Sequence, residues 1–110
     1  METVGIVLNV GRDHMEDFER GFRQHELPIW DDYVSRGIML HASLTKMEVS
    51  TQRVEGAVQY LISVAFADSE GHHIHDDDPR FQAWNEIADT FQVAPPIVTG
   101  GEVIVSAGQG

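Results

Sequence analysis

The stretch that decides the fold is residues 3–26, which opens with Thr-Val-Gly-Ile-Val-Leu-Asn-Val over residues 3–10. These eight residues are short, apolar and rich in β-branched side chains, which predicts a strand. Residues 14–26 continue as His-Met-Glu-Asp-Phe-Glu-Arg-Gly-Phe-Arg-Gln-His-Glu. Apolar or aromatic side chains recur there at steps of three or four, at Met15, Phe18, Phe22 and His25. That spacing predicts a helix with one apolar face, capped by Asp13.

A second helical segment follows, because Pro28 resets the chain and can open a new helix that Gly37 closes after Ser35. Residues 38–47 and 57–68 predict two further strands, separated by a polar loop at residues 48–55. A second polar connection covers residues 68–77.

The last helix begins at Asp78-Pro79, where an aspartate can cap the helix and a proline can occupy its first position. Its apolar stripe is Phe81, Trp84, Ala88 and Phe91. A loop containing Pro95-Pro96 and Gly100-Gly101 leads to a final strand, expected at residues 102–106.

The predicted order is strand, helix, strand, strand, helix, strand, which is typical of an α+β, ferredoxin-like βαββαβ fold. Residues 1–110 then form a single domain, with both helices on one face of a four-stranded antiparallel sheet. Alternate positions of the strands leave neither sheet face fully polar. A single chain would therefore expose an apolar patch, and we expect two sheets to pack face to face in a homodimer, a dimeric α/β barrel.

The charge balance excludes several classes of partner. Eighteen carboxylates stand against seven lysines and arginines, which gives a formal net charge of −11 at pH 7. Such a surface repels nucleic-acid phosphates and anionic membranes. There is no cysteine, which excludes disulfides and thiolate chemistry, and no apolar run approaches the roughly 20 residues of a membrane span. We expect a cytoplasmic protein.

His25 is the first candidate catalytic residue, because an imidazole on the apolar face of a helix is costly unless it is hydrogen-bonded, and it titrates near neutral pH. His41 is the second. It belongs to a set of strand positions that mixes small and isolated polar residues, as ligand pockets do, with Asn9, Ser43 and Ser63 as candidate hydrogen-bonding partners of a substrate. If the helices cover this face, His25 and His41 meet across it. The alternative is a loosely packed core in which these polar groups bond one another.

Residues 71–80, Gly-His-His-Ile-His-Asp-Asp-Asp-Pro-Arg, combine ligand types that zinc or iron accept. A loop before a helix is a poor scaffold for a metal, so we expect no metal site and instead a lid from which His73 or His75 reaches the pocket. Glu26 or Asp32 could orient a catalytic histidine by a hydrogen bond. Trp30 and Trp84 offer flat surfaces for an aromatic substrate.

The element order, together with Phe-Arg-Gln-His-Glu-Leu-Pro-Ile-Trp-Asp-Asp-Tyr at residues 22–33 and Asp-Asp-Pro-Arg-Phe-Gln-Ala-Trp at residues 77–84, resembles the dimeric α/β-barrel superfamily. Within it the chain is similar to the small RedY-like proteins, the family of HapK, from prodiginine-type pigment pathways. The resemblance covers nearly the whole chain but includes no diagnostic catalytic motif. It implies a homodimer, a pocket between sheet and helices, no cofactor, and tailoring of pyrrole or indole intermediates.

The chemistry that the resemblance implies is dehydration to an aromatic ring, which suits the available residues. Dehydration needs a base to remove a proton and an acid to release hydroxide as water, and histidines with a carboxylate can serve as both. Two other functions remain open on the same fold: a cofactor-independent monooxygenase, and a non-catalytic protein that binds a reactive pathway intermediate.

Overall fold

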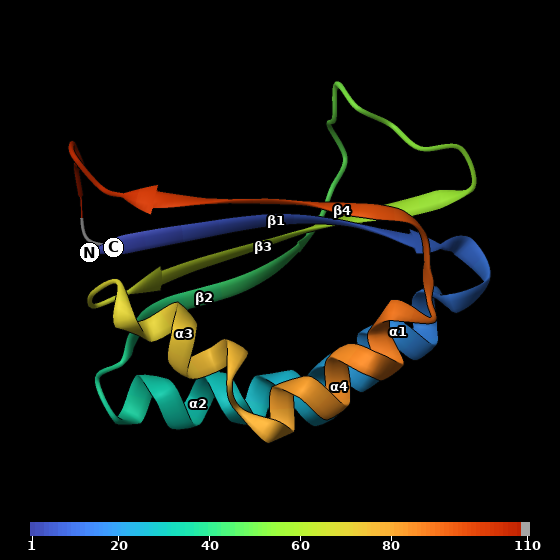
Figure 1. Ribbon diagram of the computed structural model, residues 1–110. Helices are drawn as coiled ribbons and strands as arrows, with labels where there is room; N and C mark the ends of the chain where they lie inside the picture. The colour runs from blue at the N-terminus through green and yellow to red at the C-terminus, as the bar shows by residue number, and fades with distance from the viewer. Residues whose placement is uncertain (109–110) are drawn as a thin grey trace.

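The computed structural model describes residues 1–108, which fold around one four-stranded antiparallel sheet (Figure 1). The strands lie side by side in the order β2-β3-β1-β4, so β1 is central and β2 and β4 form the two edges. Each neighbouring pair is antiparallel. Their bounds are β1 Glu2–Gly11, β2 Met39–Lys46, β3 Ala57–Phe66 and β4 Gln92–Glu102.

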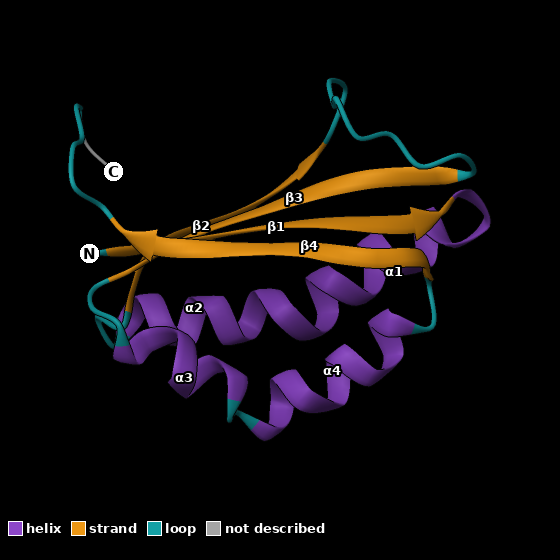
Figure 2. Ribbon diagram, turned by 45° about the horizontal axis from the view of Figure 1, so that its top comes forward, coloured by secondary structure: helices purple, strands orange, loops and turns teal. Residues whose placement is uncertain are grey.

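All helices lie on one face of this sheet (Figure 2). This arrangement confirms the predicted ferredoxin-like fold. A 3-10 turn at Arg12–His14 leads into α1, and the predicted cap by Asp13 is not made. None of the helices in residues 1–108 is long and apolar enough to cross a membrane. The helical elements are α1 Met15–Gly21, a π-helical turn at Phe22–Glu26, α2 Leu27–Ser35, α3 Glu70–Asp76 and α4 Pro79–Asp89.

Two predicted helix ends are confirmed in detail. Gly37 has φ +75 and follows α2, and the N–H groups of Gly37 and Ile38 donate to the carbonyls of Val34 and Tyr33. This is the Schellman pattern, in which a glycine in the left-handed region ends the helix. Asp78 caps α4, because its side chain accepts a hydrogen bond from the backbone N–H of Arg80.

The sheet face that meets the helices carries the large apolar side chains of alternate strand positions. Val10, Tyr60, Val64 and Phe66 are buried there together with Phe18, Ile29 and Tyr33 of the helices. The set that we expected to line a pocket, with Asn9, His41, Ser43 and Ser63, therefore lies on the opposite face, because successive side chains of a strand alternate. A bulge between Met39 and His41 brings Met39 alone from that set onto the helix face.

The last strand does not lie where the sequence predicts it. β4 contains Pro95, Pro96, Gly100 and Gly101, and residues 103–106 lie beyond its end. Prolines are tolerated because β4 is an edge strand, where one row of N–H groups needs no partner. The register with β1 shifts at the prolines, and the Asn9 side-chain amide donates to the Pro95 carbonyl at 3.1 Å.

The connection predicted as a polar loop at residues 68–77 contains α3. This short helix packs on the end of the sheet at Gly71, where a Cβ atom would collide with the Phe66 ring. The close approach requires glycine, and it brings the histidines of α3 over the helix-covered face of the sheet. The opposite face carries no helix in the described chain; the β2–β3 connection rises on that side at one end of the sheet, and the segment after β4 rises at the other (Figure 1).

Candidate functional site

A cavity of about 490 Å³ lies between the sheet and the helices. Its floor is apolar, from Val4, Ile6 and Leu8 of β1 and Ile62 and Val64 of β3. The volume is in the range of pockets that hold small organic ligands. The remaining walls are rich in aromatic rings, those of Phe18, Phe22, Trp30, Phe66, Phe81 and Trp84.

Glu26 and His75 form a pair in the wall of this cavity. Nε2 of His75 lies 2.6 Å from Oε1 of Glu26, and the two side chains are only 14% and 5% exposed. The imidazole also packs against Phe81, with ring centroids 4.1 Å apart. Oε2 of Glu26 is buried without a hydrogen-bonding partner in residues 1–108. A buried carboxylate oxygen without a partner is unusual and needs an explanation, of which a catalytic role is one.

The π-helical turn accounts for the burial of Glu26 and for the exposure of His25. The N–H of Leu27 donates to the carbonyl of Phe22, five residues back instead of four. A π turn holds more residues than an α turn, so side chains after Phe22 fall behind the 3.6-residue spacing. His25 thereby leaves the apolar face and Glu26 enters it.

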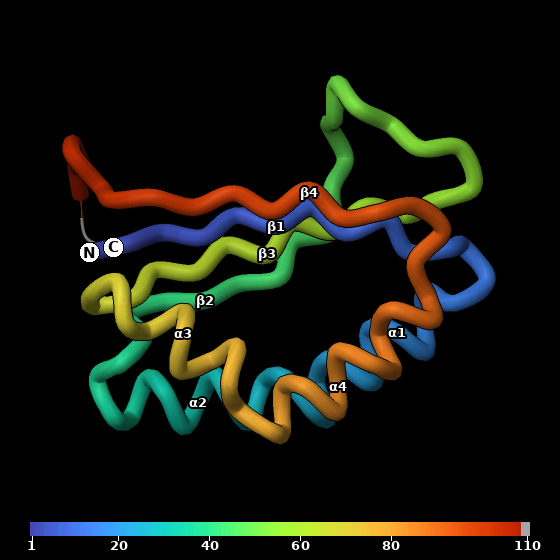
Figure 3. Tube along the Cα trace, in the orientation of Figure 1, coloured from blue at the N-terminus to red at the C-terminus, as the bar shows by residue number. Residues whose placement is uncertain are grey.

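Pro28 is the sequence signal for this wide turn. The structure has no break there: α1, the π turn and α2 form one continuous helical run (Figure 3). Proline cannot donate the hydrogen bond that an uninterrupted α-helix requires, and helices relieve this by kinking or by a wider turn. The expected boundary near Glu26 is thus a change from the π turn to α2, with Pro28 in the first turn of α2, and not a break in the helix.

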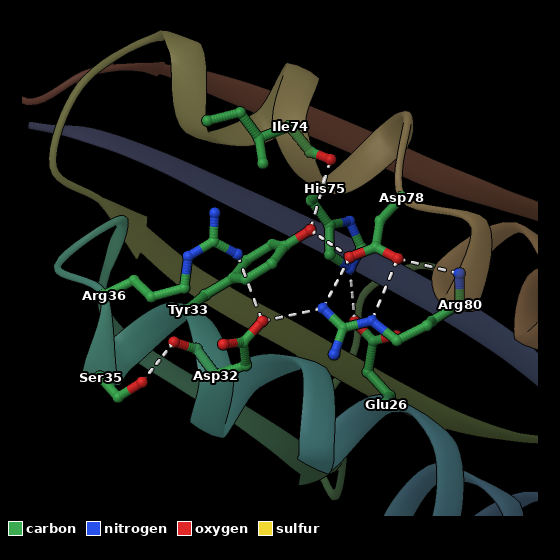
Figure 4. A network of polar contacts seen from close by, with 9 residues as sticks. All are labelled: Glu26, Asp32, Tyr33, Ser35, Arg36, Ile74, His75, Asp78 and Arg80. Carbon is green, nitrogen blue, oxygen red and sulfur yellow. Dashed lines mark hydrogen bonds and ion pairs between the residues drawn. The ribbon is translucent and has the colours of Figure 1, made fainter.

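A polar network holds α3 and the start of α4 against α2 (Figure 4). The hydroxyl of Tyr33 lies 2.7 Å from Oδ2 of Asp78 and 3.3 Å from the carbonyl of Ile74. Arg80 binds Asp78 and reaches Asp32 of α2 at 2.9 Å. His75 follows Ile74 directly, and its ring stands nearly perpendicular to that of Tyr33. The network therefore holds the segment that carries His75.

The same network shifts the pKa values of its members. The hydrogen bond from Arg80 is the largest cause that lowers the pKa of Asp78 and of Asp32 below the ordinary aspartate value. Burial, and then the hydrogen bond to the Asp78 carboxylate, raise the pKa of the Tyr33 hydroxyl. Asp32 and Asp78 are thus held ionised and Tyr33 is held neutral, which suits structural roles for all three.

A second imidazole–carboxylate pair lies one helical turn before His75. Nδ1 of His72 contacts Oε1 of Glu2 on β1, and His72 lines the cavity. α3 is therefore tied to the sheet by His72 and to the long helix by His75.

Four of the residues predicted from the sequence come together at the cavity: Glu26, Trp30, His75 and Trp84 all line it. His73 does not line the cavity; it is exposed, and its ring is tilted by 41° against that of His72, with centroids 3.9 Å apart. Asp32 is paired with Arg36 and Arg80 and orients no histidine among the described residues.

The predicted meeting of His25 and His41 is wrong within one chain. His25 is exposed and stacks on Trp84, with ring centroids 5.4 Å apart, on the helix side of the molecule. His41 is exposed on the other side of the sheet, where it pairs with Ala65 of β3. Asn9 is buried on that side, where it bonds Pro95 and Gln59. Ser43 and Ser63 face each other there across β2 and β3.

Sequence reasoning missed Glu2, His72 and Gln92. Gln92 begins β4 and lines the cavity, with a buried Oε1 that has no partner in residues 1–108. The histidine spacing of three residues, His72 to His75, would have predicted one helical face had residues 70–76 been recognised as a helix. Within the described part of the chain, no group of three or more histidine and carboxylate side chains could hold a metal ion.

No family model matches the chain, and no curated protein matches it. Solved structures do. A dimeric ferredoxin-like protein from an uncultured marine organism is similar over 99% of this chain and 92% of its own, with TM-score 0.77 and 11% identity. A protein of Nitrosomonas europaea, provisionally described as an antibiotic biosynthesis monooxygenase, matches with TM-score 0.74 and 11% identity over 96% of this chain and 100% of its own.

A Deinococcus radiodurans protein with the same provisional description is similar with TM-score 0.73 and 15% identity, over 99% of this chain and 98% of its own. At these identities the similarity shows the fold, a ferredoxin-like sheet covered on one face by helices.

Proposed function

We propose that this chain is a homodimeric enzyme that tailors a small heteroaromatic intermediate of natural-product biosynthesis without a cofactor. The observation that carries the proposal is the Glu26–His75 pair in the wall of an aromatic cavity. The reaction is dehydration of a hydroxylated pyrrole-type or indole-type ring, which becomes aromatic. The resemblance to the RedY-like, HapK-containing proteins of prodiginine-type pathways supports this choice of reaction.

The pair can provide both proton transfers. When Nε2–H of His75 donates a hydrogen bond to the Glu26 carboxylate, Nδ1 keeps a lone pair and can remove a proton from a ring carbon. The C–H electrons form the new double bond, and the neighbouring C–O bond breaks. A proton returned to the departing hydroxide completes one molecule of water. A carboxylate that orients the imidazole and stabilises its protonated form is the usual partner in such a step.

The homodimer follows from the sheet face that no helix covers. Val7, Leu61, Ala65 and Ile97 lie there among small residues. Packing of two such faces buries apolar surface and leaves both cavities on the outside of the barrel, each beneath its own helices. The dimeric ferredoxin-like protein described above supports this arrangement.

The test is incubation of the purified protein with a hydroxylated dihydropyrrole, with no added cofactor, followed by mass spectrometry. Loss of one water from the substrate supports the proposal. Glu26→Gln and His75→Gln should each lower turnover by about 10²–10⁴-fold, the usual range for a general acid or base. His25→Gln and His41→Gln are the matched controls and should turn over at the parental rate.

A cofactor-independent monooxygenase is the second candidate, favoured by the provisional descriptions of two similar structures. It would consume oxygen and add oxygen to the product mass, so an oxygen electrode run beside the mass spectrometry separates the two reactions. Binding of the substrate with neither loss of water nor uptake of oxygen would leave a carrier of pathway intermediates.

A further inference from the structure

The acidic and basic side chains that line the cavity, histidines aside, are all negatively charged. Three carboxylates line it: Glu26 in the wall, Asp76 at the end of α3 and Asp89 at the end of α4. No lysine or arginine is among the lining residues of the described chain.

The two histidines do not reverse this sign. Even when His72 and His75 are both protonated, the three lining carboxylates outnumber them. Each imidazole already contacts a carboxylate, His75 contacting Glu26 and His72 contacting Glu2 just behind the lining. The cavity therefore offers an incoming anion no uncompensated positive charge.

The nearby arginine and lysine side chains lie outside the cavity. Arg80 is engaged by Asp32 and Asp78 outside the cavity. Arg23 and Lys46 line a separate groove that shares only the Phe22 and Trp30 side chains with the cavity.

The aromatic walls act in the same direction as the carboxylates. Ring faces carry negative electrostatic potential and attract cations, most strongly at tryptophan. Trp30 and Trp84 both line the cavity and both are buried. An anion placed among such rings would lose its water without gaining a hydrogen-bonding partner of opposite charge.

We infer that the cavity selects a flat nitrogen heterocycle that carries a positive charge, as a protonated amine or an iminium, over its neutral counterpart, and that it excludes the anion. This inference rests on the proposed function and narrows its substrate class. It also predicts that the enzyme accepts no carboxylated or phosphorylated heterocycle.

Three indoles of nearly equal size separate the charge states: tryptamine as the cation, tryptophol as the neutral form and indolepropionate as the anion. Titration calorimetry at pH 7 should give a dissociation constant for tryptamine about tenfold below that of tryptophol, with indolepropionate weakest. The two tryptophan side-chain N–H signals in an NMR spectrum report whether a probe occupies the cavity.

Variants test the source of the selectivity. The double substitution Asp76→Asn with Asp89→Asn should reduce the preference for tryptamine over tryptophol. Asp77→Asn with Glu86→Gln removes the same charge from two neighbouring positions that do not line the cavity, and should leave the preference intact. Melting curves show whether both variants are folded.

Equal affinity for the three probes, or tighter binding of indolepropionate, would overturn the inference and leave the heteroaromatic site of the proposed function standing. If none of the three probes shifts the tryptophan signals at millimolar concentration, both the inference and the proposed substrate class fail. A preference for tryptamine that survives loss of Asp76 and Asp89 but disappears in Glu26→Gln would assign the selectivity to the buried carboxylate alone.

Discussion

The hydroxyl of Tyr33 donates a hydrogen bond to Oδ2 of Asp78, 2.7 Å away, and so joins α2 to the residue that caps α4. Glu26 and Tyr33 lie seven residues apart on one continuous helical run, a spacing that places both on one face. Glu26 is hydrogen-bonded to His75, and Tyr33 is hydrogen-bonded to Asp78, three residues after it. The position of the proposed proton-transfer pair therefore depends on a tyrosine that does not line the cavity.

Tyr33→Phe should lower the free energy of unfolding by about 1.5–3 kcal/mol, because it removes one hydrogen bond to a charged group. It should also speed hydrogen exchange across α3, measured by mass spectrometry. Tyr60→Phe is the matched control, because Tyr60 is also buried and donates to a carboxylate, Glu19, at 2.5 Å. Equal protection of α3 in the two variants would show that Tyr33 does not hold that helix.

The protein should lose stability in acid as the carboxylate of Asp78 becomes protonated. Its pKa lies below the ordinary value of 3.8 in the folded chain, chiefly because Arg80 hydrogen-bonds it, and returns to that value on unfolding. The stabilisation is therefore fully present above the unfolded pKa and is lost as pH falls through the folded one. Denaturant unfolding from about pH 5 to pH 2 should show a steeper loss for the parent than for Asp78→Asn. Asp77→Asn should keep the parental slope.

Gly71→Ala should move α3 away from the sheet, because the added Cβ would collide with the Phe66 ring. Overpacking of this kind costs about 1–3 kcal/mol, which chemical denaturation can measure. Gly101→Ala serves as the control, since a Cβ at that position meets nothing within 4 Å. A Gly71→Ala variant as stable as the parent would contradict the close packing of α3.

The proposed homodimer should sediment at about twice the 12.3 kDa chain mass at micromolar concentration. Ser63→Arg should give a folded monomer, because Ser63 lies in the middle of the helix-free sheet face, between Ser43 and Gly5. Gln24→Arg makes the same change of charge on an exposed helical position and should remain dimeric. A parental monomer, or a Ser63→Arg dimer, would contradict face-to-face packing.

Exhaustive chelation should change neither the melting temperature nor the turnover of the protein, because α3 directs His72 and His75 to two different carboxylates. Differential scanning fluorimetry and the dehydration assay measure the two quantities. Activity that disappears on chelation and returns only with zinc or iron would contradict the acid–base mechanism.

The order of strands and helices was predictable because it depends on local patterns: apolar alternation, the Asp78 cap and the glycine after α2. The last strand was not. Residues 102–106 have the stronger strand composition, yet Glu102 already pairs with Glu2 at the start of β1, so residues 103–106 pass beyond the sheet. Ile104 and Val105 are accordingly 88% and 85% exposed. β4 therefore ends where its pairing with β1 ends, and β1 is distant in the sequence.

The site was predictable in its residue types and only in part in its partners. Glu26, Trp30, His75 and Trp84 were each identified, and Glu26 was one of two carboxylates expected to orient a histidine, but His75, 49 positions away, was only an alternative to His25 and His41. The error at His25 arose from one assumption, a constant 3.6-residue period through residues 22–26, where the structure has a π-helical turn. The error at His41 arose from placing the helices on the wrong face of the sheet, because the alternation of side chains along the strands does not say which face the helices cover.

At Pro28, the stability of the helix and the proposed chemistry of Glu26 require different residues. Alanine there would supply the missing N–H and favour an ordinary α-helix, since proline is about 3 kcal/mol less favourable than alanine inside a helix. The same change would remove the reason for the wide turn that brings Glu26 into the apolar face. A selection for heat resistance alone would therefore favour variants in which the helix is more regular and the carboxylate no longer meets its histidine.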